Sequence, residues 1–396
     1  MQNNGHPILT PSLDEDGRLL TPFVRTQHLE PVPPPSSMVG PVAWMREHLF
    51  GGLFNTTATI LIVLGLLWVV PPFIDYIWTD AAFIGKDREA CIFNEAHPVV
   101  GACWAFIRDR FSFFIYGSYP VSERWRVDIF FVILSISIVW MMKLSLPRRD
   151  LGAVFAFIIA PVVSYFLLSG SPALGLPVVT TNLWGGLMVT VVVSCVGIVF
   201  SLPIGVLLAL GRRSKMPAAQ IFCVAFIEFV RGVPLITVLF MASVMLPLFV
   251  PREFEPDKLL RALVGVAMFA SAYMAEVVRA GLQALPKGQY EGAMALGLSY
   301  GQMMRLIILP QALKVTIPNI VSTTIGLFKD TTLVVIVGIF DFLRTIETAR
   351  IDPIWAAPTV SGTGYVFAAI FYFIFCYAMS TYARKVEERL AVADKR

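Results

Sequence analysis

Long apolar runs restrict the fold of this chain more than any other feature of its sequence. A helix of about 20 apolar residues crosses a hydrocarbon core about 30 Å thick. Hydrophobic residues make up 57% of the chain and charged residues 15%, whereas a soluble domain carries about 25% charged residues. We therefore predict an all-α polytopic membrane protein of about eight transmembrane helices. In chain order, the expected spans are Leu53–Trp78, Ile129–Met142, Leu151–Ser169, Leu183–Leu210, Val233–Val250, Leu259–Val278, Ile317–Phe340 and Tyr365–Tyr382.

Short basic loops predict the orientation of these spans. Residues 143–149 and 212–215 each carry three Lys or Arg residues, and loops of this kind stay in the cytoplasm. Alternation of the spans then places both termini in the cytoplasm and the long loop 79–127 on the opposite, periplasmic side. Residues 1–40 are polar and proline-rich, and we predict that they form a disordered cytoplasmic tail.

Two of the five cysteines lie in the long loop 79–127. On the oxidising side of the membrane, Cys91 and Cys103 are expected to form a disulfide, and the alternative is two free thiols. The other three cysteines lie in apolar runs and are interpreted as inert packing residues. No cysteine spacing indicates a zinc or haem site.

The polar stretch Glu276–Pro310 lies between apolar runs, yet it is too polar and too interrupted to span a bilayer. Gly297 permits a backbone break between two short amphipathic pieces. Pro310 cannot continue the hydrogen-bonding ladder, so the second piece is expected to end or kink near it. We interpret the stretch as a docking element for a soluble partner, and the alternative is an ordinary amphipathic loop on the membrane surface.

Several enzyme motifs are absent from the sequence. It contains no G-x-x-x-x-G-K-[ST] loop, no G-x-S-x-G elbow and no H-E-x-x-H, and all four histidines precede residue 98. These absences disfavour ATP binding through a P-loop and nucleophilic catalysis with a membrane-embedded histidine base. We expect no catalytic residue, no cofactor site and no metal site in this chain.

The spacing inside the polar stretch resembles a known protein family. The pattern E-[AG]-A, three residues, G, nine residues, I-x-L-P runs from Glu291 to Pro310, and it is similar to the loop of binding-protein-dependent ABC importer permeases, which usually have alanine where this chain has Gly292. The neighbouring residues resemble polar amino acid permeases at Glu228–Leu235, Ala275–Gly281, Leu285–Gln289, Leu309–Ala312 and Lys329–Leu333. The segments Ala102–Phe106 and Glu123–Arg126 look like the larger, M-type subunit of general L-amino acid importers.

This resemblance implies an architecture, a place in the inner membrane of a bacterial cell and a set of partners. It implies a type I importer core over residues 183–390, with a coupling loop at 281–312 and three extra helices in an N-terminal extension at 41–182. The implied partners are a second homologous permease, a cytoplasmic ATPase dimer that binds ATP-Mg, and a periplasmic amino acid-binding protein that delivers L-amino acids. The residues that the resemblance assigns to ATPase coupling are Glu291, Gly292, Ala293, Gly297, Ile307, Leu309 and Pro310.

Charged residues inside the seventh expected span suggest a substrate path. Lys329 and Asp330 lie near the middle of that span, where ionisable groups are costly and usually face a partner or an aqueous path. With Asn319, Thr323 and Thr331 they are candidates for contact with an amino acid zwitterion. The alternative is a structural ion pair, including one with the partner permease.

Two Glu–Arg pairs have helical i, i+3 spacing, Glu228 with Arg231 and Glu276 with Arg279. This spacing brings the two side chains of a pair together on one face of a helix. The expected topology places both pairs near the cytoplasmic side. We interpret them as gate or scaffold salt bridges, with substrate ligands as the alternative.

Two other functional classes compete with the importer permease. A secondary carrier driven by an ion gradient often contains inverted repeats, and this sequence shows no convincing internal repeat. A scaffold without a transport role would leave the costly pair Lys329 and Asp330 without a purpose. The importer permease therefore accounts for more of the sequence than either alternative.

Overall fold

The computed structural model describes residues 12–13, 19–20, 40–93, 99–143, 147–251, 253 and 256–394. The chain divides into two units, Met1–Phe73 and Ile74–Arg396. In the first unit, strands β1 (Ser12–Leu13) and β2 (Leu19–Leu20) pair antiparallel, and helix α1 (Pro41–His48) precedes helix α2 (Leu53–Ile74), which ends just past the unit boundary. The predicted disordered tail at 1–40 lies almost wholly outside the described residues.

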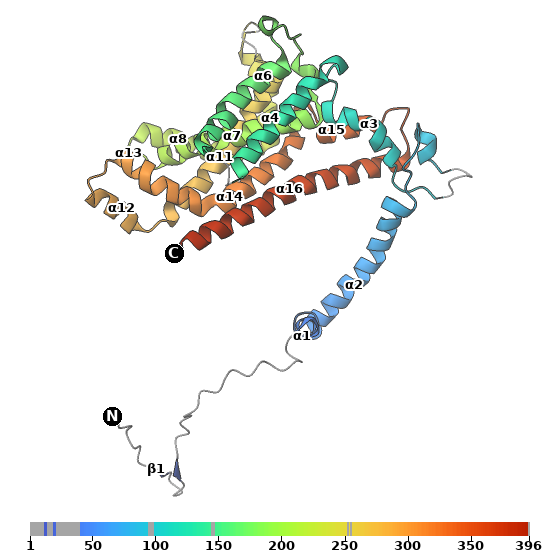
Figure 1. Ribbon diagram of the computed structural model, residues 1–396. Helices are drawn as coiled ribbons and strands as arrows, with labels where there is room; N and C mark the ends of the chain where they lie inside the picture. Colours follow the sequence, from blue (N-terminus) through green and yellow to red (C-terminus); the bar gives the residue numbers. More distant parts are fainter. Residues whose placement is uncertain are drawn as a thin grey trace. The chain divides into compact units, whose positions relative to one another are not determined.

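The second unit is a helical bundle (Figure 1). Its N-terminal helices are α3 (Trp104–Tyr116), α4 (Arg124–Met142), α5 (Arg149–Val154) and α6 (Ala160–Ser169). Its central helices are α7 (Gly186–Arg212), α8 (Pro217–Gly232), α9 (Leu235–Phe240), α10 (Leu246–Phe249) and α11 (Lys258–Ala284). The last part contains α12 (Lys287–Ala295), α13 (Tyr300–Met303), α14 (Leu309–Asp330), the short strand β3 (Phe340–Asp341), α15 (Phe342–Ala349) and α16 (Pro358–Asp394).

The described residues contain seven helices long and apolar enough to cross a membrane, and an eighth if one bent pair counts as a span. This agrees with about eight predicted spans. The span predicted over Val233–Val250 corresponds to the helix Leu235–Phe249, which forms a pair with Pro217–Gly232 bent by 106°, and the pair counts as the eighth span only when its two helices are taken together. Val233 precedes Pro234 and is extended, with φ −117° and ψ 147°. Steric conflict with the proline ring disfavours the helical conformation at that position.

Helices α7 and α11 form the centre of the bundle through close backbone approach at glycines. A Cβ atom on Gly205 of α7 would lie 2.8 Å from the Met274 Cβ and 3.0 Å from the Ala275 nitrogen of α11. Gly281 of α11 is similarly close to Thr316 and Ala312 of α14. Small residues let membrane helices approach closely enough for extensive van der Waals contact.

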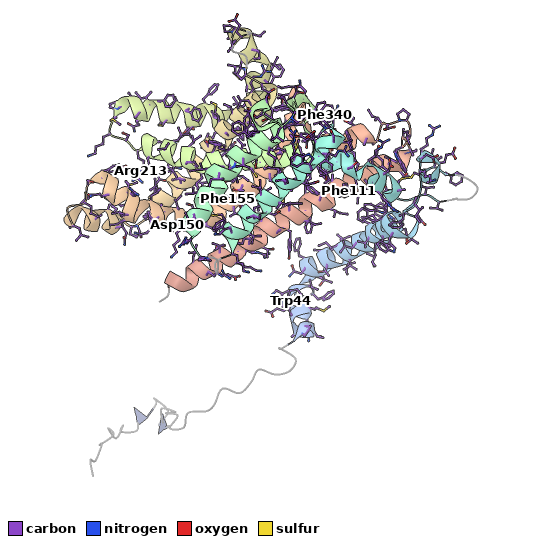
Figure 2. The ribbon with its side chains drawn as sticks, turned by 45° about the horizontal axis from the view of Figure 1, so that its top comes forward. Trp44, Phe111, Asp150, Phe155, Arg213 and Phe340 are labelled. Carbon is purple, nitrogen blue, oxygen red and sulfur yellow. A yellow bond between two sulfur atoms is a disulfide. The ribbon has the colours of Figure 1, made fainter. Side chains whose placement is uncertain are left out.

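The two ends of the bundle carry different structures. At one end, which we call the loop end, α12 and α13 lie beside the C-terminal end of α7 (Figure 1). At the other, which we call the disulfide end, β3 pairs with Gly185 and Gly186 at the start of α7. Figure 2 shows Arg213 at the loop end and Phe340 at the disulfide end. The chain therefore presents two separate sets of connecting segments, one at each end.

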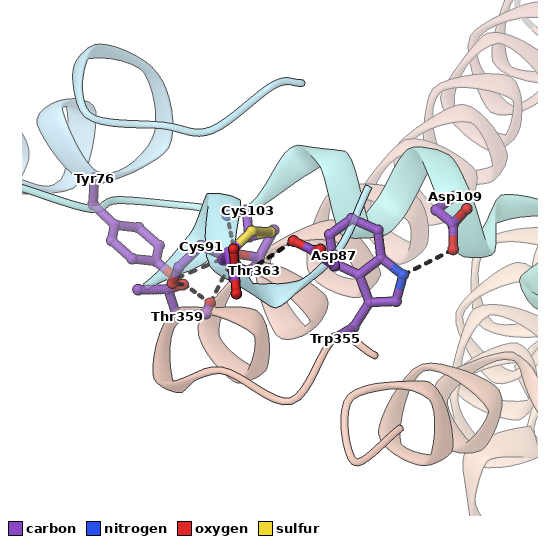
Figure 3. Close-up of a disulfide and its surroundings, with 9 residues drawn as sticks. Tyr76, Asp87, Cys91, Cys103, Asp109, Trp355, Thr359 and Thr363 are labelled. Atoms are coloured by element: carbon purple, nitrogen blue, oxygen red, sulfur yellow. Dashed lines mark hydrogen bonds between the residues drawn. A yellow bond between two sulfur atoms is a disulfide. The ribbon is translucent and has the colours of Figure 1, made fainter. Parts of the chain in front are cut away.

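A disulfide joins Cys91 to Cys103 at the disulfide end (Figure 3). Both residues are buried. The Cys103 amide donates to Thr363 Oγ1 at 2.7 Å, and Thr359 Oγ1 donates to the Cys91 carbonyl at 3.1 Å. Trp355 Nε1 donates to Asp109 at 2.8 Å. The disulfide thus closes the loop before α3, and the hydrogen bonds to Thr359 and Thr363 hold that loop against the start of α16.

Asp341 is a fully buried carboxyl group at the start of α15. Its side chain accepts hydrogen bonds from the Leu343 and Arg344 amides and so caps the helix. Burial raises the pKa of Asp341 to about 7, although the two amide hydrogen bonds oppose this rise. The Asp341 pKa is therefore far above its value in an unfolded chain.

We predict that replacing Cys91 and Cys103 together by serine lowers the free energy of unfolding by about 3 kcal/mol, because the unfolded chain regains the entropy of a short closed loop. Thermal unfolding of the purified protein measures the loss. Cys376→Ser serves as the control, since Cys376 is a free cysteine. A double variant as stable as this control contradicts the prediction.

We also predict that the stability contributed by Asp341 is present below about pH 4 and is lost as the pH rises through about 7. Asp341→Asn keeps a capping oxygen but does not titrate. Between pH 5 and pH 8 the wild type should therefore lose roughly 2 to 3 kcal/mol relative to this variant. Unfolding curves of both proteins measured at the two pH values check this, and parallel pH dependences would contradict it.

Candidate functional site

Helix α12 is bounded by residues that set its two ends. Pro286 precedes it with φ −58° and ψ 140°, and the helix ends before Gly297, which has φ +70°. The Gly297 amide donates to the Met294 carbonyl, and the Leu298 amide donates to the Ala293 carbonyl. A residue with a Cβ atom is strained in this left-handed region. By contrast, a Cβ atom on Gly292 would meet nothing within 4 Å, so the alanine usual in the resembled family would fit there.

The second helical piece does not end at Pro310, so the stop expected there is wrong. Ser299 and Gln302 form a reciprocal capping box at the start of α13. The helical segment then runs from Tyr300 to Val337 and includes a π-helical turn at Met304–Ile308. In this turn the Leu309 amide donates to the Met304 carbonyl. Pro310 follows in the first turn of α14, where its missing N–H costs little.

The predicted coupling residues differ in exposure. Ala293 is buried, Ile307 and Leu309 are half-buried, and Glu291, Gly292, Gly297 and Pro310 are exposed. Ala293 belongs to an apolar cluster that joins α7, α8, α11, α12 and α14. Four large apolar side chains point outward nearby, with exposed fractions of 58% for Met294, 77% for Leu296, 59% for Tyr300 and 64% for Leu306. The loop end therefore combines a packed inner face with an exposed apolar outer face.

Glu276 is the centre of a cluster of charged side chains at the loop end. Its Oε1 lies 2.8 Å from Arg212 Nη1, and its Oε2 lies 2.8 Å from Arg279 Nε and 3.7 Å from Arg231 Nη1. The Glu276–Arg279 pair therefore forms as its spacing predicts. Glu228 forms an ion pair with Arg212, at 2.9 Å, rather than the expected pair with Arg231. Arg231 instead joins Glu276 and lies over the Tyr273 ring.

Sequence reasoning missed the role of Arg212 and Arg213, which it used only as markers of topology. Arg212 links α7 to both acidic residues of the cluster. Arg213 Nη1 lies 3.3 Å from the Leu282 carbonyl oxygen and 3.3 Å from the Tyr290 hydroxyl. No local pattern predicts these contacts, because they join residues about 16 to 77 positions apart. The capping box was detectable from its S-x-x-Q spacing.

The candidate substrate-path residues divide into two groups. Asn319, Thr323 and Asp330 occupy positions i, i+4 and i+11 of α14, which fall on one helical face. Lys329 is exposed, and Lys329 and Asp330 lie at the C-terminal end of α14 rather than mid-helix. Thr331 is 1% exposed and donates to the Phe328 carbonyl. The structure thus brings three candidates together on one face and places Thr331 in the core.

Over the described part of the chain, no group of three or more His, Cys, Asp or Glu side chains is arranged to hold a metal ion. The charged cluster around Glu276 contains two carboxylates and three guanidinium groups that compensate them. Its chemistry is that of an ion-pair network that ties three helices together.

Comparisons with known proteins match the chain to one family of membrane proteins. Residues 201–392 match the family described as binding-protein-dependent transport system inner membrane component. The chain is 47% identical over 352 residues to the inner membrane amino-acid ABC transporter permease protein YhdY of Escherichia coli strain K12, which covers 88% of this chain and 92% of that protein. It is 38% identical over 435 residues to the glutamate/glutamine/aspartate/asparagine transport system permease protein BztC of Rhodobacter capsulatus, covering 93% and 98% of the two chains. A crystal structure of an amino acid ABC transporter with histidines aligns with a TM-score of 0.46 and 26% identity over 52% of this chain and 92% of that chain.

Proposed function

Because the chain belongs to the family of binding-protein-dependent transport system inner membrane components, we propose that it carries polar L-amino acids inward across the bacterial inner membrane. The observation that carries this proposal is the 47% identity to an amino-acid permease over 88% of the chain. The relatives differ in their named substrates. The name of the Escherichia coli relative gives only amino acids, whereas that of the Rhodobacter capsulatus relative gives glutamate, glutamine, aspartate and asparagine. These four are polar, and the motifs around Arg231 and Asp330 resemble permeases of the same class.

The family fixes the general role of the chain. It is a multi-pass inner-membrane permease subunit of an ABC importer, and it works with a separate ATPase subunit and a substrate-binding protein. ATP is hydrolysed on the ATPase subunit and not by this chain. The family assignment therefore sets aside the ion-driven secondary carrier and the scaffold.

Our proposal adds three finer points about the partners. A second permease subunit completes the translocation path, because Asn319 on the polar face of α14 is exposed in this chain. The ATPase binds ATP-Mg, and this chain binds neither ATP nor Mg²⁺. The ATPase takes hold of α12 and the segment up to Pro310, where Met294, Leu296 and Leu306 offer an exposed apolar surface.

The same proposal orients the bundle. The loop end faces the cytoplasm, where the ATPase is, and the disulfide end faces the oxidising periplasm, which suits the bond between Cys91 and Cys103. Helix α16 ends toward the loop end (Figure 1), in agreement with a cytoplasmic C-terminus. Alternation of the spans along the sequence places the N-terminus on the same side.

For the substrate path we propose the face of α14 that carries Asn319, Thr323 and Asp330, with Lys329 beside it. A zwitterion needs one acceptor and one donor, and Asp330 and Lys329 supply these charges. The ion pairs around Glu276 lie at the loop end, away from this face. They act as a gate or brace and not as substrate ligands.

Uptake by the reconstituted complex tests the proposed function. Proteoliposomes that contain the chain, its second permease and its ATPase are supplied with the binding protein and labelled glutamate or glutamine. We expect uptake that requires ATP and persists when ionophores collapse the ion gradients. Uptake that needs an ion gradient but no ATP would contradict the proposal.

A matched pair of glycine variants tests the coupling role of the loop. Gly297→Ala forces a side chain into a left-handed conformation at a cost of about 1–2 kcal/mol, whereas Gly292→Ala enters open space. We expect Gly297→Ala to lower ATP-driven uptake about fivefold or more, while Gly292→Ala stays near the wild type. Equal uptake by the two variants, at equal amounts in the membrane, contradicts the coupling role of Gly297.

A further inference from the structure

The C-terminal end of α7 carries two adjacent arginines whose side chains reach different parts of the loop end. Arg212 is the last residue of α7, and Arg213 caps the helix through its own amide, which donates to the Leu210 carbonyl at 3.1 Å. Successive residues of a helix point about 100° apart. One short, hydrogen-bonded piece of backbone therefore holds two cationic groups that face different neighbours.

Arg212 faces the membrane-spanning helices. Its Nη1 lies 2.9 Å from Glu228 on α8 and 2.8 Å from Glu276 on α11. Glu228 lies in the last two turns of α8, close to the bend at Val233 and Pro234. The position of the Arg212 side chain thus bears directly on how α8 is held against α7 and α11 next to that bend.

Arg213 faces the coupling segment. Its Nη1 contacts the Leu282 carbonyl oxygen and the Tyr290 hydroxyl, each at 3.3 Å, and its guanidinium group lies 5.7 Å from the centre of the Tyr290 ring. Tyr290 belongs to α12, and its hydroxyl donates to the same Leu282 carbonyl at 3.0 Å. These contacts make one compact polar junction between α7, the end of α11 and α12.

We propose that Arg212 and Arg213 are positioning residues that transmit the movement of α12 to the ion cluster at the bend between α8 and α9. A shift of α12 moves Tyr290 and therefore Arg213. Arg212 must follow because the two residues share a continuous backbone, and its contacts with Glu228 and Glu276 then change. Small shifts at one site are amplified where interfaces and packed helices switch between discrete arrangements, and this junction lies between three packed helices. The inference rests on the proposed function, since it assumes that an ATPase moves α12.

The coupling ratio of the complete reconstituted complex tests this role. The ratio is the number of amino acid molecules taken up for each ATP hydrolysed in the presence of the binding protein. We expect Arg213→Gln to lower this ratio about fivefold or more. Tyr290→Phe, which removes only a hydroxyl group, should lower it in the same direction. Both changes break the Arg213–Tyr290 contact, and Tyr290→Phe also removes the hydrogen bond to the Leu282 carbonyl. The loss in the double variant should therefore be smaller than the sum of the two single losses.

Lys215→Gln is the matched control, because Lys215 is another exposed cation of the same loop. Its ratio should equal that of the wild type, which removes loss of positive charge as an explanation. A wild-type ratio in Arg213→Gln, or additive losses in the double variant, overturns the role of Arg213. Failure of the wild-type complex to take up amino acids with ATP overturns the proposed function itself, so the two failures are distinct.

Discussion

The close approach of α7 and α11 is the contact on which the rest of the bundle depends. Gly205 lets the α7 backbone lie against Met274 and Ala275 of α11. Gly197, which is closer to the start of α7, lies against Val266, which is closer to the start of α11. The two helices therefore run in the same direction. Their first residues therefore meet at the disulfide end, and their last residues meet at the loop end. The disulfide, the coupling segment and the ion cluster around Glu276 are built where these two helices begin or end.

The two ends are joined by different physical means. At the disulfide end, a covalent bond and buried hydrogen bonds fix the connecting segments, with Asp341 buried beneath them. At the loop end, partly exposed ion pairs meet around Glu276. Exposed ion pairs contribute little to stability, so they rearrange at low cost. One end is thus suited to staying fixed, and the other to moving when a partner moves α12.

Much of this arrangement was predictable from the sequence, and the failures have physical causes. Apolar length predicted nearly all of the spans, and the glycine at position 297 marked a true left-handed turn. The apolar run at Val233–Val250 did not reveal that its helix lies at 106° to Pro217–Gly232, because the bend depends on the extended residue Val233 before Pro234. The helix stop expected at Pro310 does not occur, because a π-helical turn accommodates the proline. The contacts of Arg212 and Arg213 were missed because their partners are distant in sequence. The burial of Thr331 was missed because helix spacing alone does not reveal which face of a helix is buried.

The central claim is that an ATPase takes hold of the segment around α12, and site-specific photocrosslinking tests it most directly. A photoreactive residue is placed at Leu296, which is 77% exposed at the loop end, or at Ile84, which is 85% exposed at the disulfide end. In membranes that contain the assembled complex, we predict a crosslink to the ATPase subunit from position 296 and none from position 84. A crosslink to the ATPase from position 84, or none from position 296 in an assembled complex, would contradict the account.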